Sequence, residues 1–540
     1  MEPKSNHEPH AYGQVADSGT VRSSGKLLWR VFHGHFHFAL CRAGLDAYIE
    51  DMSRLIRFLF AGGRLFLGLS MVPLIAFGVE TTSSERLPNI IFITVDDLGW
   101  ADLGCYGSKF HETPAIDRLA AEGMRFTDAY AAAAVCSPTR AAMLTGRYPA
   151  RLGLTDWLRA EYQGGKIPAD RKNPTGFDKN PDSKLDTPTN ALWLELDEMT
   201  TAEVLKKRGY TTAHIGKWHL GFDDWSPEAQ GFEVNIGGGD VGEPPSYFDP
   251  FLRPANTAWK EPALKGIPKM PSRLHGEYLS DREADEAVNF IRQHRGGPFL
   301  LDLWHYAVHL PLGAKPELIE KYKAKNPQGG QKNPDYAAMI ESVDQALARI
   351  VAVLDELDIA SRTIIVFTSD NGGLSWITDN APLRAGKGEP YEGGIRVPFI
   401  VRWPGVVPPN STCNTPVISV DLLPTFTEIA GAALPVDRKI DGVSMVPLLR
   451  GAPSLEREAI FWHYPHYRQG NATPYTIVRK GDWKLIMRYG GKPSELFDLS
   501  QDLSEKNDLA AEQPEKVKEL ETAITNWTKD VGARLPRAGN

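Results

Sequence analysis

Apolar residues form several short, uninterrupted runs along this chain. Residues 89–95 read Asn-Ile-Ile-Phe-Ile-Thr-Val, and residues 363–368 form a second run of the same kind. Such runs of β-branched and aromatic residues are typical of strands that are buried on both faces, as in a parallel sheet. Shorter runs at residues 211–215 and 299–303 predict two more strands.

Helical periodicity separates these strands. Residues 116–122 and 200–208 predict two helices, and residues 335–357 predict a long one. The long helix has one apolar stripe, which comprises Ile340, Val343, Leu347, Ile350, Val351 and Leu354. Strands that alternate with helices predict an α/β fold, with a large, mostly parallel sheet sandwiched by helices.

The pattern changes after about residue 435. Short strands are predicted at residues 459–464, 475–479, 483–488 and 495–499, followed by a helix over residues 514–530. We therefore expect a larger α/β domain over residues 87–435 and a smaller C-terminal α+β domain, residues 436–540, with an antiparallel sheet. Two stretches rich in Pro and Gly or in Pro and charged residues, 163–190 and 237–271, predict surface insertions, which either shape a substrate cleft or are plain loops.

Composition places the chain among ordinary globular proteins. It has 540 residues, of which 42% are hydrophobic and 24% are charged, with a formal net charge of −8. The length suits two domains. The acidic balance and the lack of a basic tract argue against a nucleic-acid partner.

We predict that the first 78 residues are not part of the mature protein. Residues 1–51 are irregular, and His33, His35 and His37 alternate there either as a metal-binding face or, as we favour, as a His-rich stretch without an ion. Residues 52–78 combine arginines, an apolar run and the small-x-small site Ala76-Phe77-Gly78, the order of a secretory signal peptide. This predicts export to a periplasmic, secreted or lysosomal-type compartment, with no stable membrane partner. An uncleaved anchor is the alternative.

Polar residues follow the two predicted strands that have the longest apolar runs, residues 89–95 and 363–368. Asp96-Asp97 follows the first run, and Asp370-Asn371 follows the second. If these strands are parallel neighbours, the four side chains converge beyond their carboxyl ends. Three carboxylates and an amide oxygen favour Ca²⁺ or Mg²⁺ over Zn²⁺. The alternative is that Asp and Asn are simply turn formers.

One of the four cysteines has unusual neighbours. Cys136-Ser137-Pro138-Thr139-Arg140 precedes a helical pattern that begins around Thr139. A cysteine alone is ordinarily a small buried hydrophobe. At a helix start, however, backbone N–H groups favour anions, and Arg140 adds a permanent charge. Of the remaining cysteines, Cys105 and Cys413 could pair, which spacing cannot show.

This motif, followed by Leu144-Thr145-Gly146-Arg147, resembles the signature of the formylglycine-dependent sulfatase family, within the alkaline phosphatase superfamily. Many members have Ser at the position of Thr139, a mild departure. The block Gly216-Lys217-Trp218-His219-Leu220-Gly221 matches without departure. His309, two residues before Pro311, and Lys387, ahead of Tyr391, match as well. The motifs span residues 88–431.

The resemblance implies a specific site. Cys136 would be oxidised to formylglycine by a formylglycine-generating enzyme, and its hydrated form would attack sulfur. One Ca²⁺ would be bound by Asp96, Asp97, Asp370, Asn371 and the oxygen at position 136. The catalytic set would comprise Cys136, Arg140, Lys217, His219, His309 and Lys387. Within it, Lys217, His309 and Lys387 would contact the substrate, His309 or Lys387 would protonate the leaving alcohol, and His219 would act as a base.

The expected function is hydrolysis of sulfate esters, and a sulfated carbohydrate is preferred over a small aryl sulfate. The aromatic run Trp462-His463-Tyr464-Pro465-His466-Tyr467 either lines the mouth of the cleft or packs at a strand end. A phosphodiesterase or phosphonate hydrolase of the same superfamily is the first alternative, although no second set of metal ligands can be assembled. An inactive secreted protein that binds metal or glycan is the second.

Overall fold

The computed structural model describes residues 86–158, 167–179, 183–254, 263–468 and 473–539. The chain divides into two units, residues 1–81 and 82–540. The first unit lies outside the described residues, as do the predicted non-mature segment 1–51 and signal peptide 52–78. Every element below belongs to the second unit.

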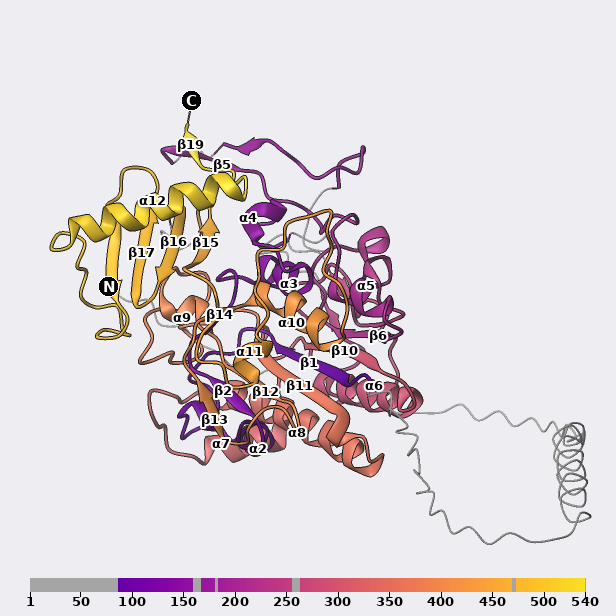
Figure 1. Ribbon diagram of the computed structural model, residues 1–540. Coiled ribbons are helices and arrows are strands. Elements are labelled where there is room, and N and C mark those ends of the chain that lie inside the picture. The colour runs from indigo at the N-terminus through magenta and orange to yellow at the C-terminus, as the bar shows by residue number, and fades with distance from the viewer. Residues whose placement is uncertain (1–85, 159–166, 180–182, 255–262, 469–472, 540) are drawn as a thin grey trace, which may run out of the picture. The chain divides into compact units, whose positions relative to one another are not determined.

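A mixed sheet of eight strands forms the centre of this unit (Figure 1). Strands β7, β6, β10, β1 and β11 are parallel neighbours in that order, and β12, β2 and β13 continue the sheet beyond β11 through two antiparallel pairs and one parallel pair. The bounds are β1 Asn89–Val95, β2 Met124–Phe126, β6 Thr211–Gly216, β7 Val234–Ile236, β10 Phe299–His305, β11 Thr363–Ser369, β12 Phe399–Arg402 and β13 Ser411–Cys413. The mostly parallel sheet that the sequence predicts is confirmed.

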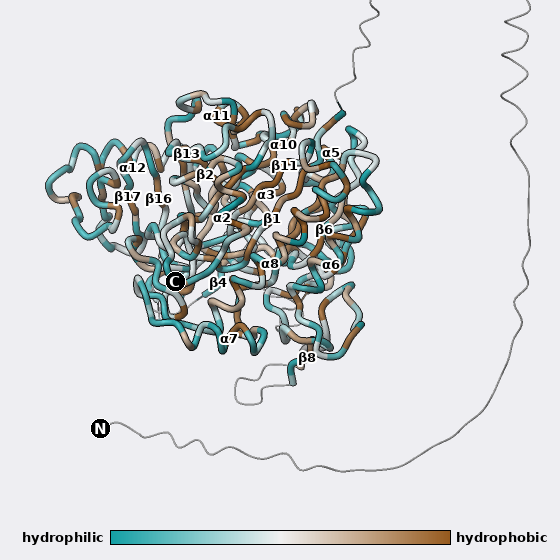
Figure 2. Tube along the Cα trace, turned by 90° about the horizontal axis from the view of Figure 1, so that it is seen from below, coloured by the Kyte–Doolittle hydropathy of each residue, from teal (hydrophilic) through white to brown (hydrophobic). Residues whose placement is uncertain are grey.

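Helices cover both faces of this sheet (Figure 1). One apolar cluster joins the sheet to α2 (Pro114–Ala121), α6 (Leu279–His294), α7 (Pro316–Lys323) and α8 (Pro334–Glu356). A second cluster joins the other face to α3 (Cys136–Thr145), α5 (Thr201–Lys206), α10 (Leu422–Ile429) and α11 (Val446–Leu449). Hydrophobic residues gather along strands such as β1 and β6, whereas peripheral loops are mostly hydrophilic (Figure 2).

The C-terminal part forms a second, antiparallel sheet. Its strands follow the order β15 (Ile460–Tyr464), β16 (Tyr475–Lys480), β17 (Trp483–Arg488) and β18 (Glu495–Asp498), and α12 (Pro514–Asp530) packs on it. Side chains such as Trp462 and Tyr475 share an apolar cluster with Tyr130 and Val135, which precede α3 in the chain. The predicted antiparallel sheet and helix are therefore confirmed, and they pack next to the segment that leads into α3.

Short elements complete the described structure. Two-stranded pairs are β3 (Ala129–Tyr130) with β14 (Val417–Ile418), and β8 (Leu252–Arg253) with β9 (Leu264–Lys265). A small sheet has the order β19 (Arg537–Ala538), β5 (Leu185–Pro188) and β4 (Phe177–Asp178). The remaining helices are α4 (Pro149–Leu152), α9 (Glu392–Ile395) and the 3₁₀ turns Gly104–Tyr106, Asp223–Trp225, Pro227–Gln230, Ala360–Arg362 and Ser419–Asp421.

Two expectations from the sequence need correction. The first part of the segment 237–271 is largely buried rather than on the surface, because Gly237 accepts a hydrogen bond from Tyr306 Oη and Gly239 accepts one from the backbone of His219. Helix α3 begins at Cys136, not near Thr139. Pro138 lies in its first turn, where a missing N–H removes no helical hydrogen bond.

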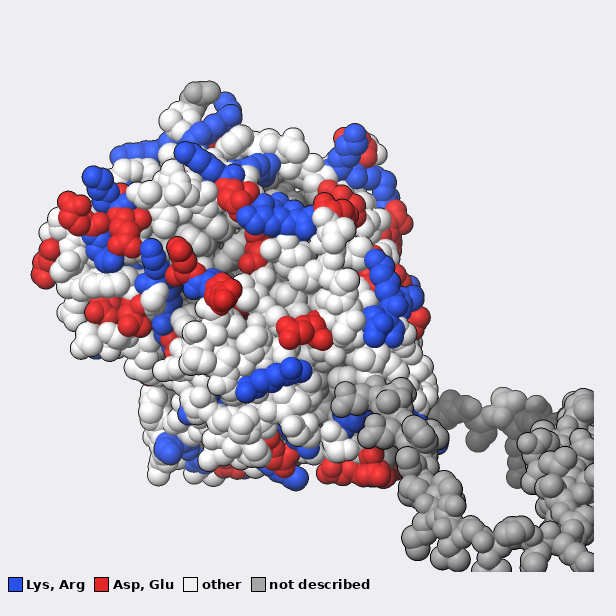
Figure 3. All heavy atoms as spheres, viewed as in Figure 1, with Lys and Arg blue, Asp and Glu red and all other residues white. Residues whose placement is uncertain are grey.

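Three further observations concern the molecule as a whole. Cys105 and Cys413 are both free thiols. Basic and acidic side chains are mixed over the face seen in Figure 3. Among the described residues, none of the helices is long and apolar enough to span a membrane.

Candidate active site

Two strand ends bring the predicted metal ligands together. Strands β1 and β11 are parallel and pair in register up to Val95 and Ser369, so Asp96-Asp97 and Asp370-Asn371 leave the sheet side by side. The Asp97 backbone N–H donates to Asp370 Oδ1 at 3.2 Å. The side chain of Asn371 donates to Asp97 Oδ1 at 2.8 Å. All four side chains are buried.

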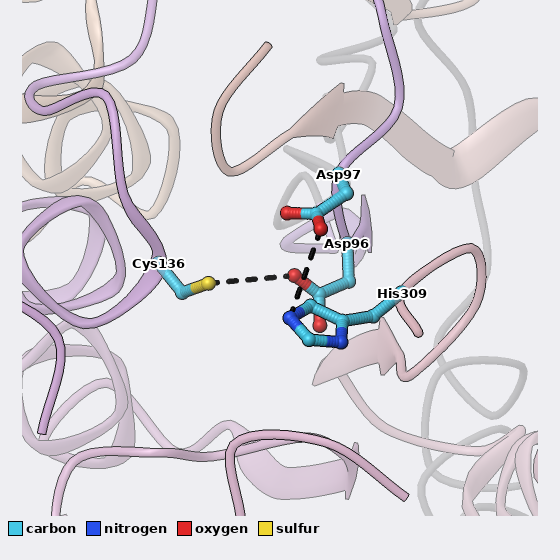
Figure 4. Close-up of side chains that lie close together, drawn as sticks. All are labelled: Asp96, Asp97, Cys136 and His309. Carbon is cyan, nitrogen blue, oxygen red and sulfur yellow. Dashed lines mark hydrogen bonds and ion pairs between the residues drawn. The ribbon is translucent and has the colours of Figure 1, made fainter. Parts of the chain in front are cut away.

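Cys136 faces Asp96 and Asp97 from the side opposite to His309 (Figure 4). It is the first residue of α3, it is buried, and its Sγ lies 3.6 Å from Asp96 Oδ1. Thr139 holds the preceding turn, because its Oγ1 accepts from Ala133 N and lies 3.0 Å from Ala133 O. The sulfur atom therefore faces the carboxylates from a fixed helix start.

Arg140 and Lys217 are buried and contact the carboxylates of Asp370 and Asp96. The fully buried Arg140 donates from Nε to Asp370 Oδ2 at 2.9 Å and from Nη1 to the carbonyl of Lys217 at 2.7 Å. Lys217 Nζ lies 2.6 Å from Asp96 Oδ2. Arg140 thus connects the residues after β11 to those after β6, and its guanidinium is engaged by the protein itself.

Lys387 and His309 are the most accessible of these side chains. Lys387 Nζ lies 2.6 Å from Asp97 Oδ1, and His309 Nε2 lies 3.7 Å from Asp97 Oδ2. Their side chains are 8% and 14% exposed, whereas those of Arg140 and Lys217 are 0% exposed. His309 Nδ1 lies 2.8 Å from the carbonyl of Leu310, which leaves Nε2 facing the cluster (Figure 4). Solvent and ligands therefore reach the site from this side.

His219 is held by backbone groups. Its Nε2 lies 3.0 Å from the carbonyl of Leu158, and its Nδ1 is buried without a hydrogen-bond partner. Its backbone adopts a left-handed conformation, with φ of 59°. Burial, with the charge of Lys217, lowers its pKa well below the usual value, so the ring is neutral at physiological pH. No hydrogen bond joins it to Cys136 in the described part of the chain.

The charges in the cluster compete. Burial opposes ionisation of Cys136, but Lys217 and Lys387 outweigh it and lower the pKa of the thiol to about 6. Burial and the nearby Asp370 raise the pKa of Asp96 well above its usual range, although Lys217 opposes them. Lys387 and His309 lower the pKa of Asp97 despite burial. The lysines therefore do not fully offset the negative charge around Asp96.

Part of this cluster could hold a metal ion. Oxygen or nitrogen atoms of Asp96, Asp97 and His309, together with Cys136 Sγ, lie within 4.8 Å of one another. Asn371 Oδ1 is buried and has no hydrogen-bond partner. A buried carbonyl oxygen beside several carboxylates is a typical ligand for Ca²⁺. A candidate metal site therefore lies here, and its carboxylate and amide oxygens are donor types that Ca²⁺ takes.

Several supporting residues were not found from the sequence. Tyr336 on α8 lies 3.1 Å from the carbonyl of Asp97 and 2.7 Å from Asp102 Oδ2, and it contributes to fixing Asp97 in a left-handed conformation with φ of 62°. Glu283 on α6 lies 2.6 Å from His305 Nδ1 and so holds the end of β10. These contacts join distant segments, and local spacing carries no signal for them.

The family model named Sulfatase matches residues 88–432. The chain belongs to the sulfatase family. A second model, the C-terminal part of N-sulphoglucosamine sulphohydrolase, matches residues 387–530. This sulfatase is therefore a sulfuric ester hydrolase, and its fold is that of the alkaline phosphatase-like superfamily.

Individual relatives cover most of the chain. A sulfatase from Formosa agariphila is 33% identical over 505 residues, which cover 83% of this chain and 89% of the relative. Human arylsulfatase A is 31% identical and covers 78% of this chain and 83% of its own. The crystal structure of Ps i-CgsB in complex with k-i-k-neocarrahexaose has a TM-score of 0.67 and 31% identity, and covers 82% of this chain and 93% of its own.

Proposed function

We propose that this sulfatase hydrolyses sulfate esters of a carbohydrate, with a formylglycine made from Cys136 and one Ca²⁺ in the site. The observation that carries the proposal is the convergence of Cys136, at the start of α3, with the carboxylates that follow β1 and β11. Lys217 and Lys387 lie against those carboxylates. A sulfate next to position 136 would thus meet two ammonium groups and the first turn of a helix.

Asp96, Asp97, Asp370 and Asn371 would hold the ion. The buried and unpartnered Oδ1 of Asn371 and the raised pKa of Asp96 support this assignment. When bound, Ca²⁺ supplies a fixed positive charge that activates the nucleophile and offsets the charge of the sulfate.

The side chains of this protein would bind the sulfate, position the metal ligands and transfer protons. Lys217 and Lys387 neutralise the sulfate oxygens, and they are placed before the substrate arrives. Arg140 keeps Asp370 and the Lys217 backbone in place. His309 presents Nε2 on the open side and would donate a proton to the leaving alcohol. His219, neutral and with an unpartnered Nδ1, would accept a proton when sulfate is released.

A carbohydrate substrate is supported by a solved relative that is in complex with k-i-k-neocarrahexaose. The aromatic run after residue 461 does not add to this support. Trp462 is 2% exposed and donates from Nε1 to the carbonyl of Ala131, and Tyr464 is 3% exposed. These rings pack between the two parts of the molecule and present no open face to a sugar.

We further propose that the protein is exported and that a formylglycine-generating enzyme acts on it. The arginines, apolar run and small-x-small site within residues 52–78 support export. The motif from Cys136 to Arg140 supports the modification. The catalytic domain over residues 87–435 and the C-terminal domain over residues 436–540 remain our proposed division of the mature chain.

Mass spectrometry combined with a sulfatase assay tests the proposed function. In protein from a host that has the modifying enzyme, the tryptic peptide of residues 126–140 should lose the thiol sulfur and gain an aldehyde oxygen. Cys136→Ala should abolish hydrolysis of sulfated sugars without a loss of fold, whereas Cys105→Ala should keep most of the activity. Full activity with an intact thiol at position 136 would contradict the proposal. Calcium binding without any turnover would indicate the inactive homologue instead.

A further inference from the structure

Arg468 lies against the loop that carries Lys387. It follows β15, and its guanidinium packs so closely on Gly388 that a Cβ at that glycine would overlap it. Gly388 is the residue after Lys387, and its N–H donates to the carbonyl of Ala134 at 2.8 Å. Ala134 lies two residues before Cys136. The guanidinium is therefore in contact with the residue that follows a proposed sulfate-binding lysine, and that residue is hydrogen-bonded to the segment before the nucleophile.

Among the described residues, this guanidinium has no hydrogen-bond or ion-pair partner. The Arg468 side chain is 80 residues from Gly388 in sequence, and its Nη1 is buried without an acceptor. No ion pair between described residues joins Arg468 to Glu389, the acid that follows Gly388 in the chain. A partly buried, permanently charged group without a partner is costly for the fold.

Other buried arginines in this molecule are paired. Arg396 donates to Glu392 at 2.7 Å, and Arg479 donates to Asp128 at 2.7 Å. Arg140 is paired with Asp370. A general shortage of acids therefore does not explain why the described residues leave the Arg468 guanidinium unpaired. An anionic ligand would supply the missing partner.

We propose that Arg468 binds a second anionic group of the substrate, on the sugar next to the sulfated one. This inference rests on the proposed function, because Lys217 and Lys387 already account for the sulfate that is cleaved. The planar guanidinium matches a carboxylate or a sulfate through two parallel hydrogen bonds. The substrate class is thus an acidic oligosaccharide that carries either a uronate or a further sulfate beside the cleaved ester.

Four substrates separate the possibilities. They are a sugar monosulfate and three disaccharides in which that unit is linked to a neutral sugar, a uronic acid or a second sulfated sugar. For the wild type, KM should be lowest with one of the two doubly anionic disaccharides. Arg468→Gln should raise KM for one of the two anionic disaccharides more than for the other. The disaccharide with the larger increase in KM identifies the group, uronate or sulfate, that Arg468 binds.

Arg468→Gln should raise KM for that disaccharide about tenfold or more, with a much smaller effect on the neutral one and little change in kcat. Arg468→Lys should recover only part of the loss, since an ammonium cannot bind bidentately. Arg450→Gln removes an exposed arginine and serves as the control for net charge. Equal changes in KM for all four substrates would overturn the inference while leaving the proposed function intact.

A second measurement does not depend on a folded variant. In the wild type, raising the ionic strength should increase KM more for the preferred acidic disaccharide than for the neutral one, because one additional charge pair is screened. Identical salt dependence for the two would overturn the inference. A wild type that hydrolyses none of the four substrates would contradict the proposed function itself, and this inference with it.

Discussion

In the side-chain amide of Asn371, the nitrogen has hydrogen-bond partners and the oxygen has none among the described residues. Nδ2 donates to Asp97 Oδ1 at 2.8 Å and to the carbonyl of Gly372 at 3.0 Å, whereas the buried Oδ1 has no partner. Buried carbonyl oxygens are rarely left without a partner. Because three carboxylates lie beside it, a bound cation is the partner that would satisfy both the oxygen and the excess negative charge.

Replacing one ligand should therefore release the ion. Asp370→Asn keeps the shape of the side chain and removes one negative charge, so calcium content should fall from about one ion per chain to well below half. Elemental analysis of the purified protein measures this. Asp344→Asn is the control, because Asp344 is a buried carboxylate that holds the start of α2, away from the cluster. Unchanged calcium in Asp370→Asn, or zinc at full occupancy in the wild type, would refute the assignment.

The proposed role of His309 predicts a dependence on the leaving group. A nitrophenolate leaves readily without a proton, whereas a sugar alkoxide needs one. His309→Ala should therefore lower kcat/KM for a sulfated sugar about tenfold more than for nitrophenyl sulfate. Lys387→Ala is the comparison, since the loss of a sulfate-binding group should weaken both substrates. Equal losses in His309→Ala would make His309 a binding or structural residue.

The sequence could predict those site residues that belong to short, ordered motifs. Asp96-Asp97 and Asp370-Asn371 end apolar runs, so their meeting follows once two strands are parallel neighbours. Arg468 could not be predicted in the same way. It meets Gly388 through folding of segments 80 residues apart, and nothing in its immediate neighbours marks it. The positioning roles of Tyr336 and Glu283 are likewise visible only in three dimensions.

At the scale of elements, the loop that bears Lys387 is fixed by close contacts between glycines and backbone. Gly372 N donates to Gly394 O of α9 at 3.0 Å, and Lys387 N donates to Gly373 O at 3.0 Å. A Cβ at Gly393 would overlap the carbonyl oxygens of two residues of the same loop. The loop therefore lies directly on the residues that follow β11, which sets the position of Lys387 relative to Asp97.

Gly393→Ala should displace this loop and its lysine. A shift of about 1 Å at a substrate-binding group can cost up to about a hundredfold in rate, so kcat/KM should fall at least tenfold. Thermal melting would show that the variant still folds. The matched control is Gly297→Ala, because a Cβ there meets no other atom within 4 Å. Wild-type activity in Gly393→Ala would show that the loop does not position Lys387.

Element boundaries were predictable where local pattern and burial agree. β1 covers the predicted residues 89–95, and β11 extends the predicted strand by one residue. Both strands are mainly apolar and are buried along their whole length. The segment 237–271 was misjudged because Gly and Pro are typical of surface loops, whereas its first residues are buried by hydrogen bonds to His219 and Tyr306. Those partners are absent from any local pattern.

At the scale of the whole molecule, a buried ionic cluster joins the catalytic part to the C-terminal sheet. Lys484 on β17 lies 2.9 Å from Glu392 Oε1 and 2.7 Å from Glu505 Oε1. The Glu392 backbone also donates to Glu505 Oε2 at 2.7 Å. Because α9 begins at Glu392, just beyond the loop of Lys387, this cluster connects the second sheet to the active site. Breaking one partner of such a buried cluster is expected to be strongly destabilising.

The two acids of this cluster respond to pH in opposite ways. Burial and the charge of Glu392 raise the pKa of Glu505 to about 7, although Lys484 opposes them. A raised pKa favours the folded state below the unfolded pKa, about 4.3, and this contribution is lost as the pH rises toward 7. The pKa of Glu392 is lowered despite burial, chiefly by Lys484 and Arg396, so its contribution is present above that range and is lost in acid.

Glu505→Gln isolates the first of these effects, because glutamine does not titrate and Glu392 is unchanged. The amide oxygen can still accept from the backbone of Glu392, so the cluster should keep its shape. The melting temperature of the variant relative to the wild type should therefore rise as the pH increases from about 4.5 to 7. Glu456→Gln, at an exposed position, controls for the change in net charge. A difference in melting temperature that stays constant, or that falls with pH, would mean that Glu505 does not bind its proton more tightly in the folded molecule.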